Sequence, residues 1–289
     1  MPRVSGDGAS IHYEYDDRGG DGEPVVFLQE LGYGRWMWRW QREALAPERD
    51  VIAPDTRGTG RSTAGLPPVV SRLPRRLRSS LLSGSAGYSV EGLAADLEAV
   101  LSDVGTRRAH LVGVGLGGMV AQQYAIEYSR AESLTLCSTS HGGLDAVAIP
   151  DDVRAQLVGE SGANERDALR RRLRPAFSER FVNRNPHLLD RIIEWGLEQN
   201  ADEPAREAQA AAITSFDVSD RLERIRVPTL VIHGTNDRVT PPGNARLLEE
   251  AIPDARLELI EDGSHCFFIE EAERTNELLR SFLARRLEA

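Results

Sequence analysis

The chain contains no lysine, only two cysteines and no long apolar segment. Its 35 basic residues are therefore all arginine, and 45 acidic residues outnumber them to give a formal net charge of −10. An acidic balance of this kind disfavours non-specific binding to nucleic acids and to anionic membranes. We therefore expect no nucleic acid and no membrane as a partner, and we expect a small-molecule substrate or ligand instead.

The two cysteines, Cys137 and Cys266, are too few for a disulfide framework and lack a metal-ligand spacing such as C-x-x-C. No apolar run approaches the ~18 residues that a membrane-spanning helix requires. Residues 1–17 also lack the apolar region of a secretory signal. These absences predict a cytoplasmic protein with no metal and no cofactor, and they leave its oligomeric state open.

Short runs rich in valine, leucine and isoleucine alternate with longer segments of helical periodicity. This alternation is typical of a parallel sheet flanked by helices, so the predicted fold class is α/β. The predicted strands cover residues 11–15, 25–29, 51–54, 110–114, 133–137, 229–233 and 256–260. The predicted helices fall near residues 36–46, 90–104, 118–128, 245–251 and 272–286.

Two segments interrupt the alternation. Residues 141–215 are mostly helical in pattern and show no convincing strand, which predicts a helical subdomain inserted between core segments 1–140 and 216–289. Residues 69–87 are rich in arginine, and Leu73, Leu77 and Leu81 recur among them at helical spacing. We interpret this second segment as a mobile loop, with a basic flap that contacts an anion or a partner as the alternative.

A glycine-rich turn follows the predicted strand 110–114 and precedes a helix. Gly113, Gly115 and Gly118 fit the literal pattern G-x-G-x-x-G of a dinucleotide-binding loop. However, the next strand ends in Cys137 and Ser138 and supplies no acidic partner for a ribose. The strand, turn and helix match the nucleophile elbow G-x-S-x-G better, although Gly115 stands at the serine position.

The segment HLVGVGLGGMVAQQYA resembles the nucleophile elbow of the α/β-hydrolase family. Three further segments are similar to family segments and follow in the same order: DTRGTGRS at 55–62, VPTLVIHGTNDRVTPP at 227–242 and DGSHCFFIEE at 262–271. The resemblance implies an α/β-hydrolase fold with a mostly parallel sheet, flanking helices and an inserted helical cap. The segments LTLCSTSHGG and PAFSERF look like those of small-molecule ester and enol-lactone hydrolases.

The resemblance also implies roles for single residues. Asp237 would orient and stabilise the ring of His265, which would act as general base. The N–H groups of Leu116 and Leu31 would form an oxyanion hole. Taken singly, Asp237 is more typical of a turn and His265 of a loop histidine bonded to a carbonyl, but their matched order at strand ends favours the catalytic pair.

Two departures from the family pattern change the expected chemistry. Gly115 cannot form an acyl-enzyme, and loss of the nucleophile costs a serine protease on the order of 10⁶ in kcat. Glu30 stands where the family's oxyanion loop begins, so its carboxylate would oppose a developing oxyanion if it pointed inward. An inward Glu30 would itself serve as acid or base, whereas the alternative is a solvated loop glutamate. If the Asp237–His265 pair and the oxyanion donors are placed for acyl transfer, Gly115→Ser is predicted to restore hydrolysis.

Other side chains have weaker assignments. Trp36 and Trp40 share a helix face and are expected in the core, whereas Trp38 points elsewhere and is assigned to the substrate pocket or to contact with the inserted subdomain. Packing in the core is the simpler alternative for all three. The arginine run 170–174 would attract a carboxylate substrate or form a solvated face, and the second interpretation is favoured. Cys266 is expected to be a small buried filler.

The leading hypothesis is a hydrolase for a small ester or lactone, in one version carboxylate-bearing, that lacks its covalent serine. Any turnover would then use a water in the space vacated by the serine hydroxyl, activated by His265 and Asp237. One alternative is a non-catalytic ligand-binding protein on the same scaffold. Another is an engineered replacement of the serine by glycine in an ordinary serine hydrolase.

Overall fold

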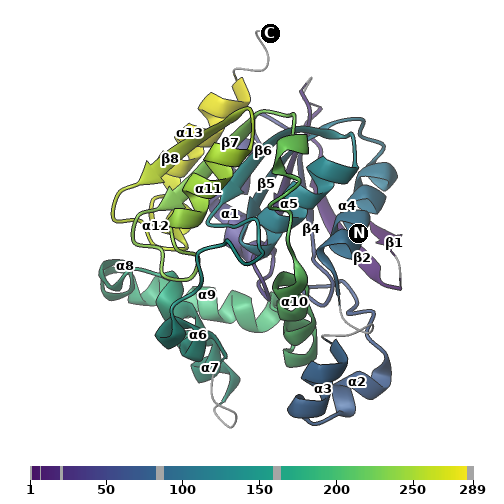
Figure 1. Cartoon of the computed structure of the whole chain (residues 1–289), viewed down its shortest axis with the longest axis vertical. Coiled ribbons are helices and arrows are strands. Elements are labelled where there is room, and N and C mark those ends of the chain that lie inside the picture. Colours follow the sequence, from purple (N-terminus) through teal and green to yellow (C-terminus); the bar gives the residue numbers. More distant parts are fainter. Residues whose placement is uncertain (1, 7, 20–21, 83–87, 159–163, 285–289) are drawn as a thin grey trace.

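An eight-stranded sheet in the order β1-β2-β4-β3-β5-β6-β7-β8 forms the centre of the molecule. The computed structural model describes residues 2–6, 8–19, 22–82, 88–158 and 164–284 (Figure 1). The strands are β1 Arg3–Ser5, β2 Ser10–Asp16, β3 Val25–Leu28, β4 Val51–Pro54, β5 Ala109–Val114, β6 Ala131–Cys137, β7 Thr229–Gly234 and β8 Ala255–Ile260. Strand β2 pairs antiparallel with both β1 and β4, and strands β3 to β8 pair parallel with one another.

This arrangement confirms the predicted α/β class with a mostly parallel sheet. The seven predicted strands are present, and β1 is an additional short edge strand that was not predicted. Strand β1 is only three residues long, with an exposed–intermediate–exposed pattern, so it carries no hydrophobic signal. Strands β3, β4 and β5 are buried along their whole length, because helices cover both faces of the sheet.

Two hydrophobic cores lie on the two faces of the sheet. One core contains side chains from α4 (Val90–Val104), α5 (Leu116–Glu127) and α11 (Gly243–Ala251). The other contains side chains from the 3-10 helix η1 (Arg35–Trp38) and from α1 (Arg39–Leu45), α12 (Phe267–Glu270) and α13 (Ala272–Ala284). None of the helices within the described ranges is long and apolar enough to cross a membrane.

Helix α4 illustrates how local sequence sets an element's bounds. The Ser89 hydroxyl accepts a hydrogen bond from the N–H of Gly92 and so caps the helix start. Gly105 ends the helix with φ 78°, a conformation that glycine adopts without steric cost. These two signals explain why the predicted bounds, 90–104, agree with the observed ones.

Helices α6 to α10 gather beyond one end of the sheet (Figure 1). They are α6 Asp151–Val158, α7 Glu165–Leu173, η2 Arg174–Ala176 (3-10), α8 Glu179–Arg184, α9 Pro186–Gln199 and α10 Glu203–Ser215. Polar contacts tie them to the core: the Gly32 N–H donates to Oε1 of Gln209, and Nε1 of Trp36 donates to Oδ1 of Asn200. The division into core and cap at residues 140 and 216 stays a prediction.

Residues 68–82 form two short helices, α2 (Pro68–Arg72) and α3 (Arg75–Leu82), so the prediction of a loop there is wrong. The side chains of Val70 in α2 and Leu82 in α3 are buried. The guanidinium of Arg78 lies 2.6 Å from the Glu207 carboxylate and 3.1 Å from that of Glu203, both on α10. These ion pairs hold the segment against α10, and the remaining residues of the predicted loop, 83–87, lie outside the described part of the chain.

Candidate active site

Gly115 forms a sharp turn between β5 and α5, with φ 50° and ψ −112°. A residue with a side chain is strained in this conformation, so glycine is favoured. The Thr139 hydroxyl donates to the Gly115 carbonyl at 2.7 Å and supports the turn from the end of the neighbouring strand β6. Position 115 therefore stands at the carboxyl end of the central strands, where ligands bind in open parallel sheets.

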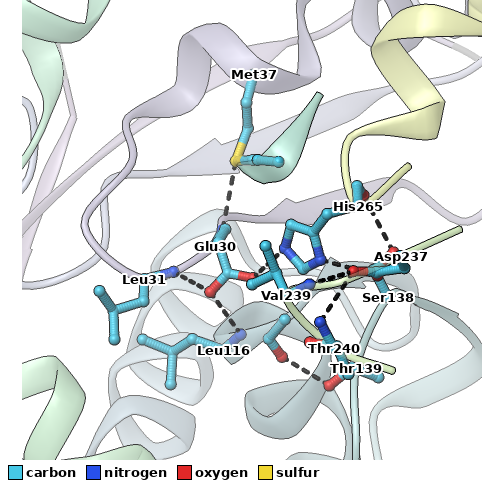
Figure 2. Close-up of polar contacts among 12 residues, drawn as sticks. Glu30, Leu31, Met37, Leu116, Ser138, Thr139, Asp237, Val239, Thr240 and His265 are labelled. Carbon is cyan, nitrogen blue, oxygen red and sulfur yellow. Dashed lines mark hydrogen bonds and ion pairs between the residues drawn. The ribbon is translucent and has the colours of Figure 1, made fainter. Parts of the chain in front are cut away.

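His265 and Asp237 meet at the same end of the sheet, from the loops that follow β8 and β7 (Figure 2). The two atoms His265 Nδ1 and Asp237 Oδ2 are 2.9 Å apart, and both side chains are buried. Asp237 also accepts the backbone N–H groups of Val239 and Thr240. Burial alone would raise the pKa of Asp237, but the charge of His265 and a hydrogen bond from His233 hold it well below its usual value.

The carboxylate of Glu30 points into this site (Figure 2). Its Oε1 accepts the N–H of Leu31 at 2.5 Å and the N–H of Leu116 at 3.3 Å, and its Oε2 lies 3.0 Å from Nε2 of His265. Only 12% of the Glu30 side chain is exposed. The alternative of a solvated loop glutamate is therefore wrong, and the two N–H groups expected in an oxyanion hole hold a carboxylate oxygen of the protein itself.

Glu30 and Gly115 share one volume. A Cβ atom built on Gly115 would lie 1.5 Å from Oε2 of Glu30, far inside van der Waals contact. The space expected to hold an activated water is therefore filled by the carboxylate in this conformation. The prediction that Gly115→Ser alone restores hydrolysis needs correction for the same reason, because a serine fits only if Glu30 moves.

His265 is held between two carboxylates, Asp237 on Nδ1 and Glu30 on Nε2. Each ring nitrogen therefore faces a carboxylate oxygen, and an imidazolium ring can donate to both. Burial lowers the pKa of His265, but the charges and hydrogen bonds of Asp237 and Glu30 outweigh burial and raise the pKa to about 10. The ring is therefore not a free base while Glu30 stays in place.

Two supporting residues were not assigned roles from the sequence. Ser138 has φ 43°, unusual for a residue with a side chain, and its hydroxyl donates to the His265 carbonyl at 3.0 Å. Ser138 therefore holds the loop that contains His265, and Thr139 holds the turn at Gly115. Both residues follow directly after β6. Their only sequence signal is that they follow a strand predicted to end beside the elbow.

Trp38 does not line the site, which corrects its assignment to the substrate-binding set. Its side chain is fully buried, and its ring packs against Phe27 and Phe268 at centroid distances of 5.1 and 4.6 Å. The indole N–H donates to the Leu28 carbonyl at 3.0 Å. Cys266 is also buried, and burial raises the pKa of its thiol well above the ordinary value.

The arginines of α7 lie in two different environments. Arg170 forms a 2.6 Å ion pair with Asp190 in which both side chains are well exposed, as expected of a solvated face. Arg172 is half-buried, and its charge acts on Arg206 of α10 and on Tyr33. Among the described residues, no ion pair is recorded for Arg172 or Arg206.

Arg206 and Tyr33 lie at the loop that begins with Glu30. Gly32 follows Glu30 by two residues, and a Cβ atom built on Gly32 would lie 3.2 Å from the side chain of Arg206. Burial and then the charge of Arg172 lower the pKa of Arg206. Burial first, and the charges of Cys266 and Glu30 with it, raise the pKa of Tyr33 well above its usual value. Arg172, Arg206 and Tyr33 therefore act electrostatically on one another beside the loop that follows Glu30.

Two cavities in the described part of the chain are lined by neither Glu30 nor His265. One, of about 30 Å³, lies beside the elbow and borders Leu28, Asp55 and Leu116. The other, of about 610 Å³, is an open groove between η1, α1 and α9. Within the ranges that the structure describes, no cluster of three or more histidine, cysteine or acidic side chains is arranged to hold a metal ion.

Comparisons with known proteins agree over most of the chain. A family model described as "alpha/beta hydrolase fold" matches residues 23–272. "Putative carbamate hydrolase RutD" from Azorhizobium caulinodans is 29% identical over 288 residues, with 98% of each chain covered. "3-oxoadipate enol-lactonase 2" from Acinetobacter baylyi is 27% identical over 268 residues, covering 92% of this chain and 90% of the relative. The crystal structure of the enol-lactonase from Burkholderia xenovorans LB400 has a TM-score of 0.80 at 27% identity, covering 98% of this chain and 100% of that one.

Proposed function

Because the chain belongs to the α/β-hydrolase fold family, we propose that it hydrolyses a small ester or lactone by direct attack of water. His265, oriented by Asp237, takes the proton of the water, and the N–H groups of Leu31 and Leu116 receive the carbonyl oxygen. Gly115 has no side chain, so no acyl-enzyme forms there. The resemblance to proteins named enol-lactonases supports a lactone among the substrates.

The main observation in support of this proposal is the orientation of the Glu30 carboxylate. The acid product of ester hydrolysis is also a carboxylate, with one oxygen from the substrate carbonyl and one from water. Oε1 of Glu30 lies on the two N–H donors, and Oε2 lies on Nε2 of His265. Glu30 therefore marks the positions that the carbonyl oxygen and the water oxygen take in the reaction.

In this mechanism the Glu30 carboxylate blocks the two N–H donors until it moves away, and we call it the gate. A substrate carbonyl reaches the N–H groups only after the carboxylate leaves, and the partly exposed side chain has a path to solvent. Its departure removes a negative charge from Nε2, so the pKa of His265 falls and the ring can lose its Nε2 proton. Entry of the substrate and activation of the base are thus coupled.

A carboxylate on the substrate fits the approach to the site. Arg172 and Arg206 repel each other electrostatically, and an anion placed between them relieves that repulsion. The Tyr33 hydroxyl lies within the influence of both charges and supplies a hydrogen-bond donor. We therefore place the carboxylate-bearing version of the substrate ahead of the neutral one.

One observation favours the alternative of a non-catalytic ligand-binding protein: Glu30 closes the oxyanion site and holds His265 protonated. Replacement of a serine by glycine in an ordinary serine hydrolase is less consistent with the structure. Such a replacement accounts for Gly115 but not for a glutamate whose oxygen occupies the Cβ position of residue 115.

Removal of the gate tests the proposal. Glu30→Ala is expected to raise kcat/KM for p-nitrophenyl acetate and for small lactones by about 10- to 100-fold, if the closed conformation is about 90–99% populated. The rate should also rise at a lower pH than in the wild type, because the His265 pKa loses the contribution of Glu30. Acetate should inhibit the variant by binding where the Glu30 carboxylate was.

The matched control is Glu43→Ala, which removes a glutamate from an exposed ion pair with Arg39 and should leave the rate unchanged. His265→Asn in the Glu30→Ala background should abolish the gain. If Glu30→Ala folds and binds acetate, as judged by a shift in its melting temperature, yet hydrolyses none of these substrates, the proposal fails and the ligand-binding alternative replaces it.

A further inference from the structure

Residues 30–33 form a turn that presents one of the two N–H donors of the site. The N–H of Tyr33 donates to the carbonyl of Glu30 at 3.1 Å and closes the turn. Gly32 stands at its third position with φ 76°, as a type II turn requires there. The Glu30 carbonyl and the Leu31 N–H belong to one trans peptide unit, in which they point in opposite directions. The turn therefore directs the Leu31 N–H to the Glu30 carboxylate, which it meets in the site (Figure 2).

Helix α10 and the segment before it hold the peptide groups of this turn. The Gly32 N–H donates to Oε1 of Gln209 at 2.6 Å, and the Gly32 carbonyl accepts the N–H of Ala201 at 2.9 Å. Gln209 is fully buried, and its Nε2 donates to the Arg57 carbonyl at 2.8 Å. Because one end of this amide must accept and the other must donate, its oxygen has a single orientation, toward the turn.

The same kind of contact continues along the loop after the turn. The N–H groups of Gly34 and Trp36 donate to Oδ1 of Asn200 at 3.0 Å and to Oε1 of Gln199 at 3.1 Å. A Cβ atom built on Gly34 would lie only 2.4 Å from Cβ of Gln199, so this approach requires glycine. Three side-chain amides between residues 199 and 209 therefore accept the N–H groups of alternate loop residues, 32, 34 and 36.

We propose that Gln209 is a positioning residue for the N–H donor of Leu31, because its amide oxygen fixes the turn that sets the direction of that N–H. This inference deepens the proposed ester hydrolysis, and its catalytic part rests on that function, in which the Leu31 N–H receives the carbonyl oxygen. Gln209 acts through the Gly32 N–H and not on the substrate. As a consequence, a displacement of α10 would displace the donor as well.

Amide hydrogen exchange, measured residue by residue by NMR, tests the positioning without any substrate. Gln209→Leu removes the acceptor of the Gly32 N–H while keeping an apolar group of similar volume, so the turn loosens. Exchange of the Leu31 N–H should become about tenfold faster, the factor expected for loss of one hydrogen bond. Its proton resonance should move upfield as the bond to Glu30 lengthens. The Leu116 N–H, which comes from α5 and donates to the same oxygen, is the internal reference.

A conservative variant and a matched control accompany this measurement. Gln209→Glu keeps an oxygen that accepts the Gly32 N–H, whether the carboxyl group is ionised or protonated, so exchange at Leu31 should stay close to the wild-type rate. Gln123→Leu makes the same change as Gln209→Leu at a buried glutamine of α5, whose recorded hydrogen bond is with Arg221. This control should leave exchange at Leu31 unchanged.

Asn200→Leu separates positioning from stability. Like Gln209→Leu, it removes two hydrogen bonds, here those from the Gly34 N–H and from Nε1 of Trp36. Its melting temperature should therefore fall by a comparable amount. Exchange at Leu31 should nevertheless be slower than in Gln209→Leu, because the contacts of Asn200 lie beyond the turn. Equal exchange at Leu31 in the two variants would show that it follows overall stability alone, which overturns the proposal.

Kinetics connect the positioning to catalysis. In the Glu30→Ala background, Gln209→Leu should lower kcat for p-nitrophenyl acetate by about 10- to 100-fold, because complete loss of an oxyanion donor costs about 10²–10³ in kcat. KM should hardly change, since a displaced Leu31 N–H weakens the transition state more than it weakens substrate binding. An equal loss in Gln123→Leu, or a loss that lies in KM alone, would overturn the catalytic part.

The outcomes distinguish this proposal from the proposed function. If Glu30→Ala hydrolyses no ester, the proposed function fails, and hydrogen exchange still decides whether Gln209 positions the turn. Wild-type exchange at Leu31 in folded Gln209→Leu overturns the positioning role, as does a Gln209→Glu variant that behaves like Gln209→Leu. If Gln209→Leu does not fold, Gln209→Asn, whose amide is one methylene too short to reach Gly32, replaces it with the same expected and contrary results.

Discussion

Gly115→Ser should destabilise the protein because of Glu30. The new Cβ would lie 1.5 Å from Oε2, so the carboxylate has to leave His265 and the two N–H donors. The serine also has to adopt φ 50° and ψ −112°, which is strained for a residue with a side chain. When Glu30→Ala is introduced first, the clash disappears and only the strain remains.

The expected magnitudes follow from these two costs. Backbone strain of this kind costs about 1–3 kcal/mol. Breaking a buried ion pair by removing one partner costs about 3–5 kcal/mol. Gly115→Ser should therefore lower the free energy of unfolding by about 4–8 kcal/mol in the wild type and by only about 1–3 kcal/mol in the Glu30→Ala background. The coupling between positions 30 and 115 is then about 3–5 kcal/mol.

Urea unfolding of the four proteins in this cycle, at pH 7, measures the coupling. Gly105→Ser is the matched control, because Gly105 has φ 78° and nothing within 4 Å of its Cβ position. Its cost should be the same with and without Glu30. If Gly115→Ser costs equally in both backgrounds, the carboxylate does not occupy that space. If Gly115→Ser fails to fold and the double variant Gly115→Ser, Glu30→Ala folds, that recovery demonstrates the same coupling.

The cycle also has a chemical readout. In the double variant Gly115→Ser, Glu30→Ala, the serine hydroxyl takes a place beside Nε2 of His265, and the Leu31 and Leu116 N–H groups are free. This variant should react with a serine-directed phosphonate, whereas the wild type and Glu30→Ala should not. An unreactive but folded double variant would show that the remaining groups do not support acyl transfer.

Two further predictions concern pH and substrate charge. The pKa of His265 is raised to about 10, so protonation of this ring stabilises the folded protein fully below pH 6.5, its ordinary pKa. This stabilisation is lost as the pH rises toward 10, by up to about 5 kcal/mol. Urea midpoints measured between pH 6 and pH 9.5 should fall with pH, less steeply in Glu30→Gln, and a flat profile would contradict the imidazolium. Arg172→Ala and Arg206→Ala should each raise KM for a carboxylate-bearing lactone by about 10- to 100-fold. Neither should affect a neutral ester, and an equal effect on both substrates would exclude these arginines as the carboxylate site.

The strands of the core were predictable because burial on both faces leaves a strong local signal. Strand β4 was predicted with its observed bounds, since its four residues are all buried and a polar segment follows them. Segment 69–87 shows the limit of this approach. Its helices α2 and α3 depend on Arg78 pairing with α10, more than a hundred residues away along the chain, and no local pattern carries that information.

The candidate site was predictable only in part. The positions of Asp237 and His265 follow from strand ends, because the carboxyl ends of parallel strands meet at one edge of the sheet. Trp38 was misplaced because spacing within a short helix does not reveal that Phe27 and Phe268 enclose the ring. Arg172 was grouped with solvated neighbours, because its approach to Arg206 depends on how α7 and α10 lie relative to each other.

The sequence by itself determined the α/β class, the order of the strand-end motifs and the absence of a side chain at position 115. Only the tertiary structure decided what Gly115 is paired with. In sequence Glu30 and Gly115 are two separate departures from a family pattern, and each suggests a loss. In space one accommodates the other, because residue 115 must lack a Cβ for the Glu30 carboxylate to reach His265 and the Leu116 N–H. Close packing leaves room for only one of the two groups, and a one-dimensional pattern does not record that exclusion.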